Sequence, residues 1–235
     1  MTVPTTTMID TTHANVDKIP TSVAYIGGYV SGTPDIQWNA ADWVRFSGRK
    51  VRNYQGLGPV PPLNMFDELD VENRALTPVS AAAIVKARVE AGFQWTTIYG
   101  GDAAIAATAS EIQKLGHSIW NGHVNCRLAN WNLNEAEATK LVGTYVHGMS
   151  CIGVQWASPS SNPHTILPGS TLTLSQANAD LSVVDAGWIP SGGFTNPNPP
   201  PPIVVSTQGI VVYGRPDGTL LNKNVSSTDG GVTWR

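Results

Sequence analysis

A chain of 235 residues, 41% hydrophobic and 13% charged, is long enough to bury one sizeable core, since barrels of about 200 to 250 residues commonly form a single domain. The formal net charge of -3 supplies no broad basic field, which makes nucleic acid a poor candidate partner. No apolar run reaches the roughly 20 residues that span a bilayer, and residues 1–7 lack a basic segment followed by an apolar one. We therefore expect no membrane insertion and no secretory signal.

The two cysteines, Cys126 and Cys151, are too few for a disulfide scaffold or for a four-cysteine zinc site. Two buried free thiols are the favoured interpretation, and a bridge between neighbouring strands stays open as the alternative. His117 and His123 lie near Cys126 along the chain, but their spacing matches no established metal-ligand pattern. We therefore expect neither a metal nor another cofactor.

Composition changes sharply after Pro190, where residues 191–202 (SGGFTNPNPPPP) have the Gly, Asn and Pro content of an extended, semi-rigid spacer. This change predicts four parts. They are an N-terminal arm (1–7), an α/β barrel (8–190), a Pro-rich linker (191–202) and a small β tail (203–235).

Short β-type runs alternate with helical patterns before the spacer, which favours strand-helix units around a parallel sheet. Eight strands are expected, the number that closes a barrel: 7–10, 23–30, 50–54, 65–72, 95–99, 124–131, 151–156 and 180–184. Helices are expected at 39–46, 77–91, 102–115 and 134–142. The link 55–64 is too rich in Gly and Pro for a helix, so the predicted fold class is an irregular TIM-type α/β barrel.

The fourth of these strands carries the most chemical information, because alternation sends its odd and even positions to opposite faces. Met65, Leu69 and Val71 share the face that would pack under helices, while Glu68, Asp70 and Glu72 share the face toward the barrel interior and its mouth. Carboxylates at i and i+2 lie roughly 6 to 7 Å apart at Cα. Repulsion between them raises one pKa, which keeps a general acid protonated near neutral pH. An amphipathic strand with its acids in water is the alternative.

Several segments extend this pattern in a fixed order along the chain. They are Ile9-Asp10, Leu69-Asp70-Val71-Glu72, Ile98-Tyr99, Leu128-Ala129-Asn130-Trp131, Gln155-Trp156-Ala157-Ser158 and Ala179-Asp180-Leu181-Ser182-Val183-Val184. The ordered set, covering about residues 9–188, resembles the glycoside hydrolase family 25 lysozymes and their relatives in phages of actinobacteria.

The resemblance implies cleavage of the β-1,4 bond between N-acetylmuramic acid and N-acetylglucosamine in peptidoglycan. Glu72 matches the family's proton donor, and Asp70 would stabilise or orient the acetamido group of the substrate as it assists at the anomeric carbon. Asp10 and Asp180 match further acidic positions of the cleft.

A second set of candidates lies at or near strand ends and would bind sugar rings. Its members are Tyr29, Tyr99, Asn130, Trp131, Gln155 and Trp156. The aromatic faces would stack on sugars while the amides form hydrogen bonds, with core packing as the alternative for each aromatic residue. The Pro-rich link 55–64, the insertion 120–123 and the long loop 159–175 depart from the family pattern. A barrel kept only for glycan binding is therefore the alternative to an enzyme.

The tail contains Ser227 to Trp234, which matches the Asp-box S-x-D-x-G-x-T-W, a structural hairpin motif. About 33 residues bury too little surface to be stable alone, so docking onto another subunit or self-association is expected, with a loosely ordered tail as the alternative. A lysozyme-like barrel followed by a stiff spacer and such a tail suggests a minor tail protein at a phage tail tip. Its expected partners are peptidoglycan, or another cell-wall glycan, and other tail proteins, and it would act outside the host cell.

Overall fold

The computed structural model describes residues 3–72, 76–116, 120 and 122–190, together with the backbone of three short strands at 204–205, 210–214 and 220–224. The predicted spacer, the Asp-box and His117 lie outside these residues. The chain divides into two compact units, Met1–Gly193 and Phe194–Arg235. In the second unit, β10 (Val204–Val205), β11 (Ile210–Gly214) and β12 (Leu220–Asn224) form an antiparallel sheet in that order.

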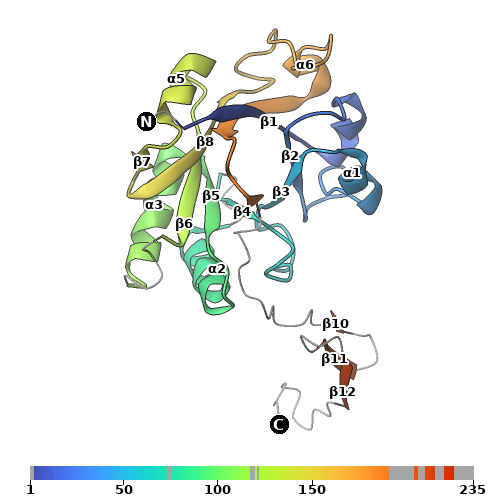
Figure 1. The fold of residues 1–235 in the computed structure, drawn as a ribbon, viewed down its shortest axis with the longest axis vertical. Coiled ribbons are helices and arrows are strands. Elements are labelled where there is room, and N and C mark those ends of the chain that lie inside the picture. Colours follow the sequence, from blue (N-terminus) through green and yellow to red (C-terminus); the bar gives the residue numbers. More distant parts are fainter. Residues whose placement is uncertain are drawn as a thin grey trace. The chain divides into compact units, whose positions relative to one another are not determined.

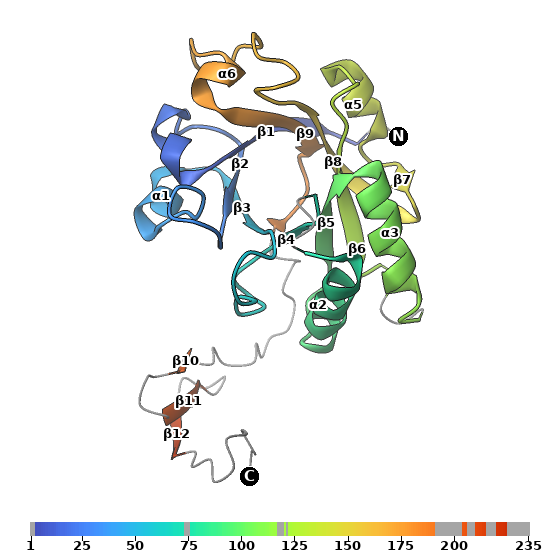
Figure 2. The same cartoon turned by 180° about the vertical axis from the view of Figure 1, so that it is seen from behind.

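In the first unit eight strands close into a barrel, as predicted, with the helices outside the ring of strands (Figure 1, Figure 2). The strands are β1 (Thr5–Thr11), β2 (Tyr25–Tyr29), β3 (Arg49–Tyr54), β4 (Glu68–Asp70), β5 (Thr96–Gly101), β6 (Val124–Ala129), β8 (Met149–Ala157) and β9 (Ala179–Asp185). They follow one another around the ring, and β9 pairs with β1 to close it. A further short strand, β7 (Tyr145–Val146), forms a hairpin with the start of β8.

One strand departs from the eight-fold parallel pattern of a TIM-type barrel. Strands β1 to β6 and β8 are parallel, whereas β9 is antiparallel to both of its neighbours, β8 and β1. A parallel strand needs a crossover that returns the chain to the other end of the sheet. The segment between β8 and β9 holds only loops and the short α6 (Leu174–Ala177), so the chain turns back where β8 ends. The fold is therefore a mixed α/β fold with a closed eight-stranded barrel.

Local signals account for the helices. Those outside the barrel are η1 (His13–Lys18), α1 (Ala40–Arg45), α2 (Pro78–Glu90), α3 (Asp102–Gln113) and α5 (Glu135–Leu141). The Thr77 side chain accepts a hydrogen bond from the Ser80 N–H at the start of α2, and Asn134 and Glu137 form a capping box at the start of α5. The four predicted helices are confirmed with slightly shorter bounds. The short η1, β7 and α6 were not predicted.

Strand β4 is much shorter than the predicted 65–72. Leu69 and Val71 are buried outside the barrel, as predicted, but the side chain of Met65 is 49% exposed and does not share their packing. The carboxylate of Asp67 instead accepts hydrogen bonds from the backbone and guanidinium of Arg52 at 2.9 to 3.0 Å, so the chain before Glu68 is held by this ion pair. Of the predicted strand, only residues 68–70 belong to β4.

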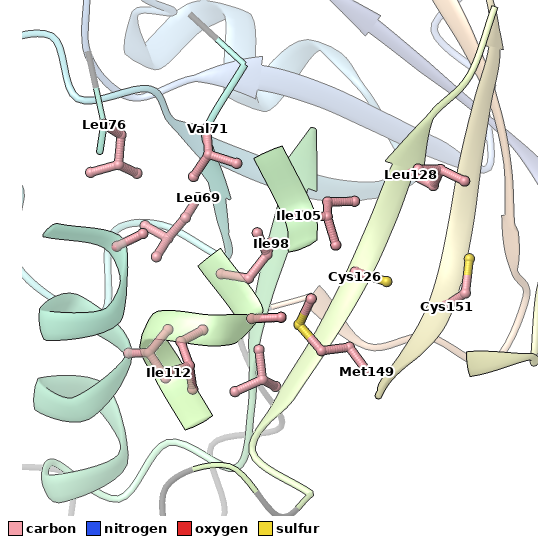
Figure 3. Packing of buried hydrophobic residues seen from close by; sticks show 14 of the residues in the cluster. Leu69, Val71, Leu76, Ile98, Ile105, Ile112, Cys126, Leu128, Met149 and Cys151 are labelled. Atoms are coloured by element: carbon pink, nitrogen blue, oxygen red, sulfur yellow. The ribbon is translucent and has the colours of Figure 1, made fainter. Parts of the chain in front are cut away.

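The largest apolar cluster lies between the strands and the helices α2, α3 and α5 (Figure 3). Cys126 and Cys151 are register partners on β6 and β8 in this cluster, and both are free and buried, which confirms the favoured interpretation of the two thiols. A separate group closes the base of the barrel, the end where the parallel strands begin: Met8, Tyr25, Val51, Ile152, Val184 and Trp188. The polar interior above this group therefore faces the opposite end, the mouth.

Gly27 leaves room for the side chain of Asp10 inside the barrel, because a Cβ at residue 27 would lie 1.7 Å from Asp10 Oδ1. We expect Gly27→Ala to lower the free energy of unfolding by about 1–3 kcal/mol, since Asp10 must move within a close-packed interior. Urea unfolding would measure the loss. Gly101→Ala is the matched control, because a Cβ there meets no atom within 4 Å. Equal stability of the two variants would contradict this role of Gly27.

Candidate functional site

A single cation organises the interior of the barrel. The Arg127 side chain on β6 is 1% exposed, and its Nε and Nη2 donate to the two carboxylate oxygens of Glu68 at 2.9 and 2.6 Å. Its Nη1 donates to Asp10 Oδ2 at 2.7 Å, to Ser182 Oγ at 2.8 Å and to Gln155 Oε1 at 3.1 Å. These contacts join residues of β1, β4, β6, β8 and β9 in one buried network.

Sequence reasoning did not single out Arg127, although a signal was present. The strand Val-Asn-Cys-Arg-Leu-Ala is otherwise poor in charge, and an arginine at its centre must find a buried acid. The strand register sends Arg127 inward, because its neighbours Cys126 and Leu128 pack in the outer apolar cluster. Glu68, which alternation also sends inward, is the matching acid.

The four predicted catalytic acids come together at the mouth. Asp10 and Asp180 are register partners on β1 and β9, and Asp70 is the last residue of β4. The Glu72 N–H donates to Asp70 Oδ1 at 3.0 Å, and Tyr99 Oη donates to Glu72 Oε2 at 3.1 Å. Antiparallel β9 begins where the parallel strands end. Asp180, the second residue of β9, therefore lies at the mouth with the other three acids.

Burial changes the proton affinity of these acids. It raises the pKa of Asp70 to about 7, with a backbone hydrogen bond from Glu72 opposing the shift and the charges of Glu72 and Glu68 adding to it. Burial, together with the charge of Asp10, also raises the pKa of Asp180 to about 7. The pKa of Glu72 is raised by burial as well, against the hydrogen bond from Tyr99 and the charge of Arg127. Near neutral pH Asp70 and Asp180 therefore exchange between the protonated and the ionised form, as acid–base chemistry requires.

The predicted sugar-binding residues divide into two groups. Tyr29 and Tyr99 face the acids, and burial raises the pKa of each phenol well above its usual value, so both keep their O–H donors. Trp131, directly beyond β6, is 38% exposed and presents a free surface.

The remaining three candidates are engaged elsewhere. The side chain of Gln155 binds Arg127 inside the barrel, and Asn130 Oδ1 accepts a hydrogen bond from the Asn132 N–H in its own turn. Trp156 packs against two outer apolar clusters, so the structure gives it the packing role that was the alternative to sugar stacking.

Comparison of the chain with protein-family models, with curated proteins and with solved structures gave no match.

In the described parts of the chain, no helix is long and apolar enough to cross a membrane. Within the same ranges, no group of three or more His, Cys, Asp or Glu side chains is arranged to hold a metal ion. The candidate site is therefore described from its geometry alone. It is a cluster of carboxyl groups at the mouth of a mixed α/β barrel.

Loss of the buried cation should be costly. We expect Arg127→Met to lower the free energy of unfolding by about 3–5 kcal/mol, because Glu68 and Asp10 would remain buried without a partner. Chemical denaturation would measure the loss, and Arg45→Met is the control, since its ion pair with the exposed Asp17 is worth only about 0–1 kcal/mol. We expect the double variant Arg127→Met/Glu68→Gln to recover part of the lost free energy of unfolding. If Arg127→Met lost no more stability than Arg45→Met, the proposed role of the buried network would be contradicted.

The raised pKa of Asp70 predicts a pH dependence of stability. Between the ordinary pKa of about 4 and the folded value of about 7, the native state holds a proton that the unfolded chain has released. Raising the pH through this window therefore lowers the free energy of unfolding, and the loss is complete above pH 7.

Asp70→Asn cannot ionise, and its side-chain oxygen can still accept the Glu72 N–H. We expect the stability of this variant relative to the wild type to rise by about 1–3 kcal/mol between pH 4 and pH 8. Denaturation curves at pH 4, 6 and 8 would test this. Parallel curves for the two proteins would show that Asp70 titrates as it does in the unfolded chain.

Proposed function

We propose that the barrel is a glycoside hydrolase of the muramidase type, acting on the β-1,4 bond between N-acetylmuramic acid and N-acetylglucosamine. The cluster of Asp10, Asp70, Glu72 and Asp180 at the mouth carries this proposal, because it places four carboxyl groups side by side and burial raises the pKa of Asp70, Glu72 and Asp180. The resemblance of the ordered segments to the family 25 lysozymes supports the same reaction and an irregular TIM-type barrel.

Glu72 is the proposed general acid. It is more exposed than the other acids of the cluster, and the hydrogen bond from Tyr99 to Oε2 leaves Oε1 to carry the proton. In the first step the carbonyl oxygen of the substrate's acetamido group attacks the anomeric carbon. The bond from that carbon to the leaving oxygen breaks, and Glu72 donates its proton to this oxygen. In the second step water attacks the anomeric carbon, the bond from that carbon to the acetamido oxygen breaks, and a proton of the water returns to Glu72.

The other acids support this reaction. Asp70 lies next to Glu72 along the strand and would accept a hydrogen bond from the acetamido N–H, which orients the carbonyl for attack. Asp180, with a pKa of about 7, would donate or accept a hydrogen bond at a sugar hydroxyl. Asp10 is bound to Arg127 and would act on the substrate through its charge and through the position of its neighbours.

A second candidate is a minor tail protein whose barrel binds cell-wall glycan without cutting it. The exposed Trp131 beside the mouth favours this candidate, because stacking on a sugar ring requires no acid. Under both candidates we place the protein at a phage tail tip, with cell-wall glycan and other tail proteins as partners.

Release of soluble muropeptides from purified actinobacterial peptidoglycan, followed by mass spectrometry, tests the enzyme. We expect the wild-type chain to release products with new N-acetylmuramic acid reducing ends, and Glu72→Gln to lower the rate by about 100-fold or more. Glu135→Gln, an exposed acid at the start of α5, is the control and should keep the wild-type rate. Binding of the glycan without release by any variant would instead support the tail protein without catalysis.

A further inference from the structure

A pocket of about 570 Å³ adjoins the proposed acid where β4 and β5 end and α2 and α3 begin. Its apolar lining comes from Val71, Leu76, Pro78 and Ala104, and its polar lining includes Thr77 and Asp102. Glu72 forms part of the wall. The pocket and the acidic mouth therefore share Glu72, the residue that would deliver the proton.

The chemistry of the lining suits a sugar ring. A pyranose has faces rich in C–H groups and an edge of hydroxyl groups, and such a ring is bound by apolar surface with a few polar groups around it. The volume lies in the range of about 300 to 1,000 Å³ that small-molecule sites occupy, which is room for one or two sugars. His147 Nε2 lies 2.9 Å from Asp102 Oδ1 and so holds this carboxylate in place on the polar side.

Glu72 separates this pocket from the other acids. A Cβ on Gly100 would lie 3.0 Å from Val71 Cγ2, so the glycine lets Val71 pack close over β5, and the same Cβ would be in ordinary contact with Glu72 Cγ at 3.6 Å. The Glu72 carboxyl group is turned to Tyr99, whose ring lies under the Arg127 guanidinium, 4.0 Å from the ring centroid. A glycan with its scissile oxygen at Glu72 thus has one sugar beside Asp70 and the next sugar in the pocket.

We infer that this pocket binds the N-acetylglucosamine that leaves when the bond is cut. The inference rests on the proposed function, because the role of Glu72 as acid and of Asp70 at the acetamido group gives the glycan its direction. The sugar that is attacked must lie beside Asp70, and the leaving sugar lies on the other side of the acid. The glycan strand therefore runs from the acidic mouth toward the first turns of α2 and α3, with its reducing end on the pocket side.

Gly101 allows this inference to be tested with little disturbance of the fold. It precedes α3 with φ -69° and ψ 163°, which any residue adopts, and a Cβ there meets no atom within 4 Å. Gly101→Gln should therefore place a side chain in the pocket without backbone strain. Ala103→Gln, at an exposed position of the lining, is a second variant for the same purpose. Ala107→Gln, exposed on α3 and outside the lining, is the matched control.

The measurement is calorimetric binding of a β-1,4-linked tetramer of N-acetylglucosamine to the full chain carrying Glu72→Gln, which prevents turnover. We expect Gly101→Gln and Ala103→Gln each to weaken binding about tenfold or more, equal to roughly 1.4 kcal/mol, and Ala107→Gln to leave it within about twofold. Absence of binding, or equal binding by all variants, would overturn the inference. Binding that is sensitive to Gly101, in a protein whose wild type releases no muropeptides, would retain the subsite and reject the proposed catalysis.

Discussion

The guanidinium of Arg127 lies at the centre of the barrel and satisfies acids and polar groups that would otherwise be buried without partners. Without it, Asp10 and Glu68 would each need a proton or a path to water. The strands that carry these groups are far apart in sequence, so the network also holds the closed ring together from the inside. Gly27 and the apolar base around Met8 serve the same arrangement, by making room for Asp10 and by closing the other end of the barrel.

The same network explains why the mouth can hold protons near neutral pH. Arg127 is engaged by Asp10 and Glu68, and it leaves Asp70 and Asp180 without a direct cationic partner among the described contacts. Their burial then favours the protonated form, as the raised pKa values show. The position of one buried cation thus separates two acids that are paired with it, Asp10 and Glu68, from Asp70 and Asp180, whose pKa burial raises to about 7.

Local patterns were sufficient for much of the fold. Alternation placed Asp70 and Glu68 inside, and the caps at Thr77 and Asn134 fixed two helix starts, because these signals involve residues only a few positions apart. The role of Arg127 depends on contacts with residues 59 and 117 positions away, which no local window contains. The reversed direction of β9 and the packing of Trp156 likewise depend on how distant segments meet. The predicted strand 65–72 is longer than β4, which spans only Glu68–Asp70, although the Asp67 backbone still donates to the Arg52 carbonyl and its side chain pairs with Arg52.

The antiparallel direction of β9 also determines where the two ends of the barrel fold meet. Because β9 runs back from the mouth, Asp185 lies beside Thr5 on β1, and the Ala186 N–H donates to the Pro4 carbonyl. Tyr25 Oη donates to the Trp188 carbonyl close by, so hydrogen bonds join the start and the end of the barrel fold at its base. Residues 4–5 and 185–188 thus meet at the base, the end of the barrel opposite the acidic mouth. The contacts that join the two ends of the barrel fold are therefore separate from the carboxyl groups of the candidate site.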